Sequence, residues 1–271
     1  MSAAFSPRLL ASRAVEKVWG RTALPTPFAG LGPARIGEIW FEPPAELPNV
    51  LVKYLFTCEK LSVQVHPSDA QAEVGEAGKE ECWLVLHAEP GACLGIGFMH
   101  AVTTQEIASA ALDGSIERLL AWHPVREGDL FYLPAGTVHA LGPGLTLVEV
   151  QQNSDTTFRL YDYGRPRELH LERALAVARG EIYGHEHRSS LSMRGKTLID
   201  GPYFRFERIH GEPDEGVAAA FNTPVLALPL EGTVTSFCGA VRAKAGECII
   251  APRLDVLKFH DADVTLLVRE A

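Results

Sequence analysis

Short apolar segments separated by Pro, Gly and polar turns run through most of the chain. Between residues 36 and 67, the segments IGEIWFEPP and LVKYLFTCEKLSVQVHP are rich in aromatic and β-branched residues. The same composition returns in ECWLVLHAEPGACLGIGF, with EPG as a turn, and in GDLFYLP and GLTLVEVQQ. Such residues are favoured on pleated strands, and Pro and Gly are typical of their ends. The pattern therefore predicts a mainly β protein.

Three stretches interrupt the strand pattern. The polar, Ala-rich segment 68–81 predicts a loop or a short helix, and TTQEIASAALDGSIERLL predicts two short helices, the first begun by a Thr N-cap and ended at DG. ELHLERALAVARG predicts one more helix. The residues expected on the buried faces of the first and last helices are Ile107, Ala110, Ala111, Leu169, Leu171, Leu175 and Val177.

Two similar segments indicate an internal repeat. VREGDLFYLPAG and RAKAGECIIAPR each place a Gly six residues before a Pro, at Gly128 to Pro134 and at Gly246 to Pro252. This predicts two copies of one β unit. His139 lies five residues beyond the first Pro, and Leu257 lies five residues beyond the second. The second copy is therefore expected to have no reactive or metal-binding side chain at this position.

The repeat predicts two domains. Residues 1–188 would form a metal-binding unit with helical insertions, and residues 189–271 a degenerate second half without metal ligands. HRSSLSMRG, residues 187–195, is the predicted linker. The tail is short for a closed barrel, so strands from the N-terminal segment are expected to help complete it.

Composition narrows the possible partners and location. The chain has 271 residues, 34 acidic against 25 basic, and a net charge of -9, which argues against a broad nucleic-acid or anionic-membrane surface. A phosphorylated substrate would need a local basic pocket. Five cysteines without a CxxC pair, no signal peptide and no apolar run of membrane-spanning length predict a soluble, cytoplasmic protein.

Four residues could ligate a metal. Gln64 and His66 are two apart, so their side chains lie on one face of a strand, and neighbouring strands could bring Glu81 and His139 to the same place. Two imidazoles, a carboxylate and an amide oxygen suit a divalent metal such as zinc. The alternative is that His66 is a turn residue before Pro67 and that His139 is a buried histidine bonded to backbone.

The segment from Gly128 to His139 has the spacing G-x5-P-x-G-x2-H, which resembles the second conserved motif of cupin barrels. In cupins, Pro and Gly turn the strand so that the histidine faces the barrel mouth. The first cupin motif is altered, because Gln64-x-His66 replaces H-x-H and Glu81 follows 15 residues after His66.

Four segments closely resemble the signatures of type I mannose-6-phosphate isomerases: KLSVQVHPSDAQA, GKEECWLVL, GDLFYLPAGTVHALG and VEVQQNSDTTFRLYDYGR. VWG at Trp19, IGEIW at Trp40 and LVKYL at Lys53 extend the likeness over residues 17–180. The chain has no room for the helical domain of the long eukaryotic forms and so resembles the short bacterial form. It departs from the family where GEIWFE replaces the frequent GESWE. The resemblance implies a bicupin, two cupin β-barrels with short helical insertions.

The resemblance also implies site residues and an activity. It implies one zinc ion per chain and interconversion of mannose 6-phosphate and fructose 6-phosphate by proton transfer through an enediolate. The implied metal ligands are Gln64, His66, Glu81 and His139. The implied active-site residues are Arg159, Asp155 and Lys79. Ser62 and Lys53 resemble residues on the phosphate-binding side of the pocket.

The proton carrier is not identified by these motifs. Glu149 lies on a predicted strand where its carboxylate could face the cavity, and a partly dry pocket can raise a carboxyl pKa toward neutrality. Lys79 is the competing proton carrier. The alternative for Glu149 is that it is a solvated strand residue without a catalytic role. His185-Glu186-His187 also reads H-x-H, but its polar flanks favour a flexible loop over a second metal site.

Two other functions stay open from the sequence. The same site could isomerise another aldose or aldose phosphate, since no motif reports the shape of the pocket away from the metal. A metal-containing sugar-binding cupin without turnover is the other possibility. In each case the partner is a small sugar or sugar phosphate, and the chain is expected to be a monomer or a homodimer.

Overall fold

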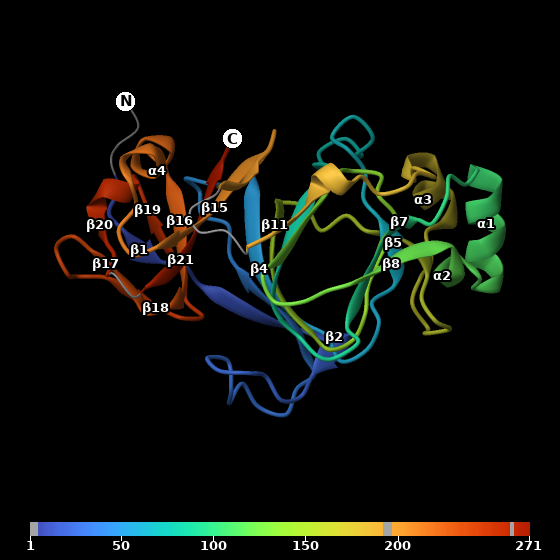
Figure 1. Cartoon of the computed structure of the whole chain (residues 1–271), viewed down its shortest axis with the longest axis horizontal. Helices are drawn as coiled ribbons and strands as arrows, with labels where there is room; N and C mark the ends of the chain where they lie inside the picture. Colours follow the sequence, from blue (N-terminus) through green and yellow to red (C-terminus); the bar gives the residue numbers. More distant parts are fainter. Residues whose placement is uncertain (1–4, 192–196, 261–262) are drawn as a thin grey trace.

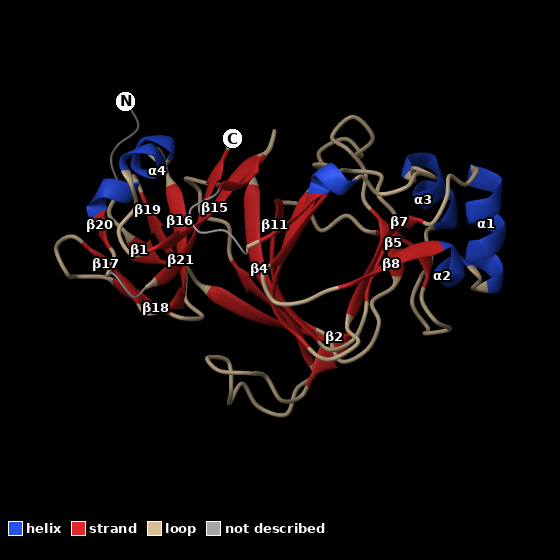
Figure 2. Ribbon diagram, in the orientation of Figure 1, coloured by secondary structure: helices blue, strands red, loops and turns tan. Residues whose placement is uncertain are grey.

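Strands dominate the computed structural model, which describes residues 5–191, 197–260 and 263–271. Four antiparallel sheets are stacked face to face, and short helices cover the ends of the stack (Figure 2). The prediction of a mainly β protein with short helices is confirmed. No helix in these described ranges is both long and apolar enough to cross a membrane.

The first pair of sheets contains the predicted site. Its seven-stranded sheet has the order β13-β9-β6-β11-β4-β3-β2, and its five-stranded sheet the order β12-β5-β10-β7-β8. The strands of the larger sheet are β2 (Ser12–Arg21), β3 (Ile36–Phe41), β4 (Val50–Phe56), β6 (Glu81–Ala88), β9 (Asp129–Leu133), β11 (Leu145–Gln152) and β13 (Arg188–Ser190). Those of the smaller sheet are β5 (Val63–Val65), β7 (Cys93–Phe98), β8 (Leu120–Pro124), β10 (His139–Leu141) and β12 (Phe158–Tyr161).

Alternating side chains give each strand of this pair an inner and an outer face. Trp83 and Phe131 of the larger sheet pack against Leu94 and Ile96 of the smaller one in a buried core. Helices α1 (Thr104–Asp113), α2 (Ile116–Leu119) and α3 (Leu171–Val177) cover the outer face of the five-stranded sheet (Figure 1).

The predicted helices form with one residue misplaced, whereas helix α4 (Glu215–Ala220), capped by Asp214, was not predicted from the sequence. Thr103 caps α1 with a capping box, Gly114 ends it in the left-handed region, and the predicted face of α1 is buried. The predicted face of α3 is wrong at Leu169, which is 47% exposed because the helix begins two residues later. Ala174 and Val177 are its buried residues.

The second pair of sheets is built mainly from the C-terminal part. Its six-stranded sheet has the order β1-β19-β16-β21-β15-β14, and a three-stranded sheet has the order β18-β17-β20. The elements are β1 (Arg8–Leu9), β14 (Thr197–Asp200), β15 (Phe204–His210), α4 (Glu215–Ala220), β16 (Val225–Glu231), β17 (Thr233–Ser236), β18 (Arg242–Lys244), β19 (Ile249–Ala251), η2 (Leu254–Val256), β20 (Leu257–Lys258) and β21 (Val264–Glu270). β1 pairs with β19, which confirms that an N-terminal strand joins this unit.

The two sheet pairs repeat one strand order. β9-β6-β11-β4 of the first pair corresponds to β19-β16-β21-β15 of the second, and β10-β7-β8 corresponds to β20-β17-β18. Gly128 and Gly246, which precede β9 and β19, both have φ 85°. His139 begins β10 and Leu257 begins β20, so the two residues hold equivalent places. The structure therefore confirms the internal repeat.

The predicted linker and domain boundary are less simple. Arg188–Ser190 form β13, which pairs with β9, and residues 192–195 of the predicted linker lie outside the described residues. The boundary at residue 188 and the two closed barrels stay predictions.

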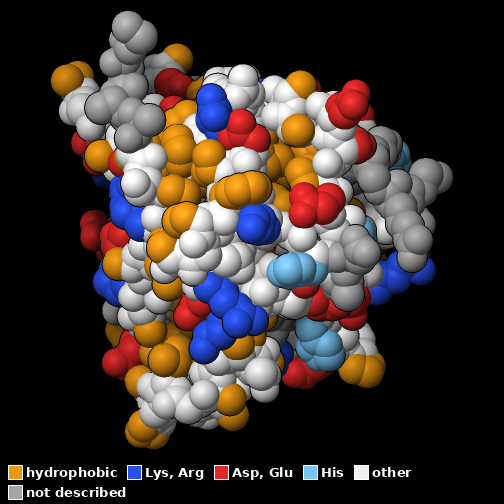
Figure 3. Space-filling model, turned by 90° about the vertical axis from the view of Figure 1, so that its left-hand side faces the viewer, with side chains coloured by type: hydrophobic (Ala, Val, Ile, Leu, Met, Phe, Trp, Pro, Cys, Tyr) orange, Lys and Arg blue, Asp and Glu red, His pale blue; other side chains and the backbone are white. Residues whose placement is uncertain are grey.

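The outer face of the seven-stranded sheet packs on the outer face of the six-stranded sheet. Tyr54 and Val148 from one side meet Phe204 and Leu266 from the other in the largest buried cluster. The stack is therefore helices, five strands, seven strands, six strands and three strands, from right to left in Figure 1. Figure 3 looks onto the left-hand end, where a hydrophobic patch lies among scattered acidic and basic side chains.

Candidate functional site

Three potential metal ligands meet between the five-stranded and seven-stranded sheets. His66 directly follows β5, Glu81 begins β6 and His139 begins β10. Their ligand atoms all lie within 4.8 Å of one another, and all three residues are buried. The structure therefore brings together three of the four residues proposed as ligands from spacing, and it places the fourth, Gln64, opposite His139 in the β5–β10 pairing.

The corner before His139 fixes the distance between the two histidines. Gly136 has φ 84°, where a side chain is strained, and a Cβ there would lie 2.8 Å from the carbonyl oxygen of Val177. Its backbone N–H donates to the carbonyl of His66 at 2.9 Å. The Pro-Ala-Gly-Thr turn thus ties the start of β10 to the end of β5.

Hydrogen bonds to backbone carbonyls set both histidine rings. His66 Nδ1 lies 2.8 Å from the carbonyl oxygen of Thr156, and His139 Nδ1 lies 2.9 Å from that of Thr137. A ring N–H on Nδ1 donates to each carbonyl, which leaves the Nε2 lone pair for a ligand. Burial lowers the pKa of both histidines, with the Lys79 ammonium as the next contribution at His66, so both rings favour the neutral form.

Glu81 faces both free ring nitrogens. Its Oε2 lies 3.5 Å from His66 Nε2, and its Oε1 lies 3.5 Å from His139 Nε2. Glu81 Oε1 is buried, and no described residue donates a hydrogen bond to it. An uncompensated buried carboxylate oxygen is costly. Two neutral imidazoles and a carboxylate that converge in this way fit a divalent cation such as Zn²⁺.

Gln64 can supply a fourth donor. Its Nε2 lies 3.3 Å from His139 Nε2, and the hydroxyl of Ser62 donates to its Oε1 at 3.0 Å. The two ends of an amide have nearly the same shape, so exchanging them would turn Oε1 toward the cluster and let Nε2 donate to Ser62. Ser62 therefore orients Gln64 in either arrangement.

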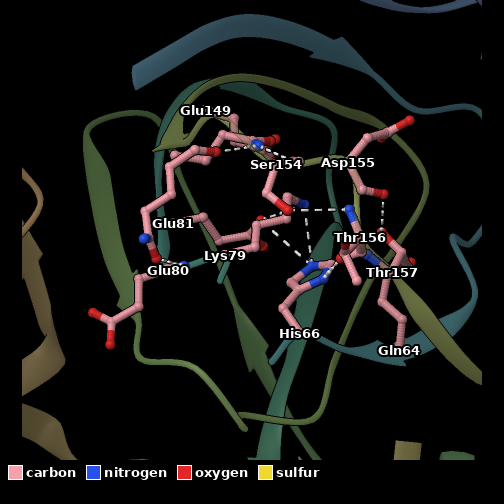
Figure 4. A network of polar contacts seen from close by, with 12 residues as sticks. Gln64, His66, Lys79, Glu80, Glu81, Glu149, Ser154, Asp155, Thr156 and Thr157 are labelled. Carbon is pink, nitrogen blue, oxygen red and sulfur yellow. Dashed lines mark hydrogen bonds and ion pairs between the residues drawn. The ribbon is translucent and has the colours of Figure 1, made fainter. Parts of the chain in front are cut away.

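Lys79 holds the positive charge of the cluster. Its Nζ lies 2.8 Å from Glu81 Oε2 and 3.1 Å from His66 Nε2 (Figure 4). Burial acts to lower the pKa of Lys79, but the Glu81 and Glu149 carboxylates outweigh it and raise that pKa. Lys79 is therefore a buried ammonium group in contact with two of the candidate ligands.

A row of polar and aromatic side chains crosses the inner face of the seven-stranded sheet next to the cluster. Lys53 on β4, Glu149 on β11 and Trp83 on β6 are register partners. Trp83 Nε1 donates to Glu149 Oε2 at 3.0 Å, and Lys53 Nζ lies 3.3 Å from Glu149 Oε1. Lys53 Nζ also lies 4.2 Å from the ring centroid of Trp40.

Neither tryptophan was identified as a functional candidate from the sequence, because strand tryptophans usually pack a core. The signal was available for Trp83, which is two residues from Glu81 and so shares its face of β6.

Arg159 faces the same space from β12. It is the register partner of Gln64, and partners in an antiparallel pair share a face of the sheet. Its Nε is buried and has no hydrogen-bond partner in the described part of the chain. Burial and then the nearby Arg167 guanidinium lower the pKa of Arg159, which nevertheless stays a cation at neutral pH. Its guanidinium group is thus available to an anionic ligand.

Asp155 is not brought into the cluster. It is exposed, and Figure 4 places it at the edge of the network, with its side chain directed away from His66. Its neighbours Ser154 and Thr156 do contact the site region, since the Thr156 carbonyl orients His66.

The long spacing between His66 and Glu81 is a loop tied to the end of β11. The hydroxyl of Ser154 donates to the Ala77 carbonyl at 2.9 Å, and Gln152 Nε2 donates to Asp69 Oδ1 at 3.0 Å. Asp69 Oδ1 also accepts from the backbone N–H of Gly78 at 2.8 Å. These bonds hold Lys79 and Glu81 against β11, and no local sequence pattern predicts them.

The second H-x-H sequence is not part of this cluster. His185–His187 form a short 3-10 helix, η1, directly before β13, so the expected flexible loop is wrong. The reason is local bonding, since the His187 N–H bonds the Gly184 carbonyl and β13 pairs with β9. Within residues 5–191, 197–260 and 263–271, the group of three metal-capable side chains is His66, Glu81 and His139.

Comparison with known proteins places this architecture in a family. No family model matches the chain. Mannose-6-phosphate isomerase ManA of Bacillus subtilis is 40% identical over 168 residues, covering 57% of this chain and 53% of that protein. The Streptococcus mutans mannose-6-phosphate isomerase is 39% identical over 57% of this chain and 52% of its own length. The chain thus matches about half the length of these relatives.

Two further comparisons extend over most of the molecule. The Bacillus subtilis protein named "Putative mannose-6-phosphate isomerase YvyI" is 33% identical over 258 residues, with 77% of this chain and 81% of that protein covered. The crystal structure of the mannose 6-phosphate isomerase from Bacillus subtilis superposes with a TM-score of 0.83 at 29% identity, covering 98% of this chain and 100% of that one. The chain belongs to the mannose-6-phosphate isomerase family.

Proposed function

We propose that the protein is a zinc-dependent aldose-ketose isomerase that interconverts mannose 6-phosphate and fructose 6-phosphate in the cytoplasm. The family relationship supports the reaction, and the buried ligand cluster supports the metal. His66, Glu81, His139 and Gln64 would hold one Zn²⁺ per chain. The bound metal would supply Lewis-acid stabilisation of negative charge on the sugar oxygens. We also propose that the protein is a monomer or a homodimer.

The reaction moves a proton between C1 and C2 of the sugar through an enediolate, so it needs a proton carrier. Glu149 is our preferred base, because its carboxylate is fixed by Trp83 and Lys53 next to the ligand cluster. Lys79 is the alternative, since its ammonium group touches Glu81 and His66. Both groups are held by packed neighbours, as proton transfer at a defined atom requires.

Arg159 is the best candidate for an anionic part of the substrate. Its buried Nε has no hydrogen-bond partner among the described residues. Arg159 is opposite Gln64 in the β12–β5 pairing, so the two side chains lie on the same face of the sheet. A guanidinium can bind an oxyanion or a phosphate with two donors. Ser62 would act through Gln64, and Asp155 would act at the rim. Lys53 is the weakest phosphate candidate because Glu149 already neutralises its charge.

The convergence of two imidazole Nε2 atoms on a buried carboxylate is the observation that carries the proposal. The test is a coupled assay of fructose 6-phosphate formation from mannose 6-phosphate, before chelation, after chelation and after zinc return. His139→Ala should lack activity at every stage, whereas the matched variant His185→Ala, in the exposed H-x-H sequence, should behave as wild type. Activity that survives complete chelation, or survives in His139→Ala, would refute the metal isomerase proposal.

Substrate choice is tested separately. Turnover of mannose 6-phosphate should exceed that of glucose 6-phosphate and of free mannose. Faster turnover of either of the other two sugars would keep the metal site and overturn the proposed substrate.

A further inference from the structure

A cavity lies on the other side of the seven-stranded sheet from the ligand cluster. It has a volume of about 390 Å³ and lies between the seven-stranded and six-stranded sheets, and we call it the junction cavity. Residues that line it include Tyr54, Phe56, Leu84, Thr146, Arg208 and Leu230. A volume of this size is within the range of small-molecule sites in proteins.

Aromatic side chains form one wall of the junction cavity. The ring of Phe28 lies edge-on to Tyr54 at 4.8 Å and to Phe56 at 5.4 Å between centroids. Phe28 belongs to the loop between β2 and β3, drawn in blue at the bottom of Figure 1. A Cβ on Gly246 would lie 2.4 Å from Pro27 Cγ, so this loop packs directly on the turn between β18 and β19. Both sheet pairs therefore shape the cavity.

Two polar groups in this apolar wall lack partners. Arg208 Nε and Thr146 Oγ1 are buried, and neither has a hydrogen-bond partner among the residues that the structure describes. Within the described ranges, no ion pair joins Arg208 to a carboxylate, and it is the nearby Arg205 that pairs with Asp200 and Glu207. Leaving such donors unpaired is costly, and proteins satisfy nearly all buried polar groups. A bound molecule with an acceptor would remove this cost.

The other charged residues that line the cavity have partners of their own or face solvent. Arg21 is already engaged, because its Nε donates to the Thr57 carbonyl and its NH2 group pairs with Glu89, each at 3.0 Å. Glu127 and Glu231 also line the cavity, but both are exposed to solvent. Arg208 is thus the cation of the cavity whose charge stays available.

We propose that the junction cavity binds a small monocarboxylate with an apolar ring. One available guanidinium matches one negative charge, and its planar fork suits the two oxygens of a carboxylate. The Thr146 hydroxyl can donate to the same group. The ring would lie against Phe28, Tyr54 and Leu84, where its burial adds hydrophobic stabilisation.

The proposal can be tested by calorimetric titration and by NMR shift mapping of the intact protein with phenylacetate. The neutral isostere phenylacetamide and the dianion phenyl phosphate serve as probes of charge. Phenylacetate should bind saturably and at least about tenfold more tightly than the amide, as expected for a hydrogen bond to a charged group. It should also bind more tightly than phenyl phosphate, whose second charge has no partner.

Two variants locate the binding. Arg208→Met should weaken phenylacetate binding about tenfold or more, and its unfolding temperature should not fall, because the substitution removes the unpaired buried donor. Leu230→Trp, which fills the cavity without removing a charge, should abolish binding, and it carries the test alone if Arg208→Met does not fold. Saturating mannose 6-phosphate should not displace the probe. Equal binding of the amide, unchanged binding in the folded variants, or displacement by the sugar phosphate would overturn the proposal.

Discussion

The ammonium group of Lys53 lies 3.3 Å from a carboxylate oxygen of Glu149, and the two side chains are only 3% and 5% exposed. The contact is an ion pair rather than an aligned hydrogen bond, since no described residue donates a hydrogen bond to Glu149 Oε1. Trp40 packs against the same ammonium group, and Trp83 donates to the second oxygen of Glu149. Lys53 therefore neutralises and positions Glu149. The positive charge of Lys53 is then largely unavailable to a substrate phosphate.

Replacing Lys53 with Met should destabilise the protein strongly. Removing one partner of a buried pair leaves an uncompensated charge and typically costs about 3–5 kcal/mol. Lys60→Met is the matched control, because Lys60 pairs with Glu117 while 41% and 29% of the two side chains are exposed, and its loss should cost no more than about 1 kcal/mol. Urea unfolding curves of the three proteins would measure the difference.

The double variant Lys53→Met with Glu149→Leu sharpens this test. It removes the stranded carboxylate and should recover part of the stability lost in Lys53→Met. If Lys53→Met instead keeps wild-type stability and only raises KM for mannose 6-phosphate, Lys53 contacts the substrate and the positioning role is wrong.

Gly136→Ala should loosen the corner that holds the two histidines. A left-handed conformation costs a non-glycine residue about 1–2 kcal/mol, and the new Cβ would also contact the Val177 carbonyl at 2.8 Å. Gly91→Ala is the control, since Gly91 has φ 85° but nothing within 4 Å of its Cβ position. Unfolding free energies should fall further for Gly136→Ala, and its zinc content should fall as well. Equal effects of the two substitutions would show that the contact is unimportant.

Removing the metal should lower stability without changing the fold. A ligand that binds only the folded state at 100 times its Kd adds about 2.7 kcal/mol to stability. Zinc returned to chelated protein should therefore raise the unfolding temperature of wild type and of His185→Ala. The shift should be absent in His139→Ala. A zinc-dependent shift of the same size in His139→Ala would place the metal elsewhere.

Patterns local in sequence predicted the elements and part of the site. The strand composition, the capping box at Thr103 and the i, i+2 placement of Gln64 and His66 each depend on neighbouring residues, and the structure agrees with them. The segments around Gly128 and Gly246 predicted the repeat because each is a short pattern of neighbouring residues and the two patterns match. Leu169 was misplaced because helix ends depend on capping, which periodicity does not report.

Contacts that depend on sheet register could not be read from one sequence. The Lys53–Glu149 pair requires β4 and β11 to be neighbours in one register, and a shift of one residue would separate the two side chains. The position of Arg159 opposite Gln64 depends on β12 pairing with β5. The junction cavity depends on how two sheet pairs stack, which no motif encodes.

Leu10→Pro should weaken the pairing of β1 with β19 at the edge of the six-stranded sheet. The Leu10 N–H donates to the Cys248 carbonyl at 2.9 Å, directly after β1 pairs with β19, and proline removes that donor. Amides of β19 should exchange with deuterium faster, whereas amides of β9, the equivalent strand in the first pair, should not change. Leu10→Ala keeps the donor and is the control. Equal protection of β19 in Leu10→Pro would mean that β1 contributes little to that edge.

His123 should make stability fall as the pH falls. Burial lowers the pKa of His123, and the nearby Arg188 and His185 lower it further. A hydrogen bond to the Ile96 carbonyl acts in the opposite direction and offsets part of this shift. The unfolded chain therefore takes up a proton at a higher pH than the folded protein. The stability present above about 6.5, the ordinary histidine value, is lost as the pH falls through the lower folded value. In His123→Gln, the drop in unfolding free energy between neutral and mildly acidic pH should be smaller than in wild type. The exposed His260→Gln should leave that drop unchanged, and an identical drop in His123→Gln would show that His123 is not among the histidines that destabilise the protein in acid.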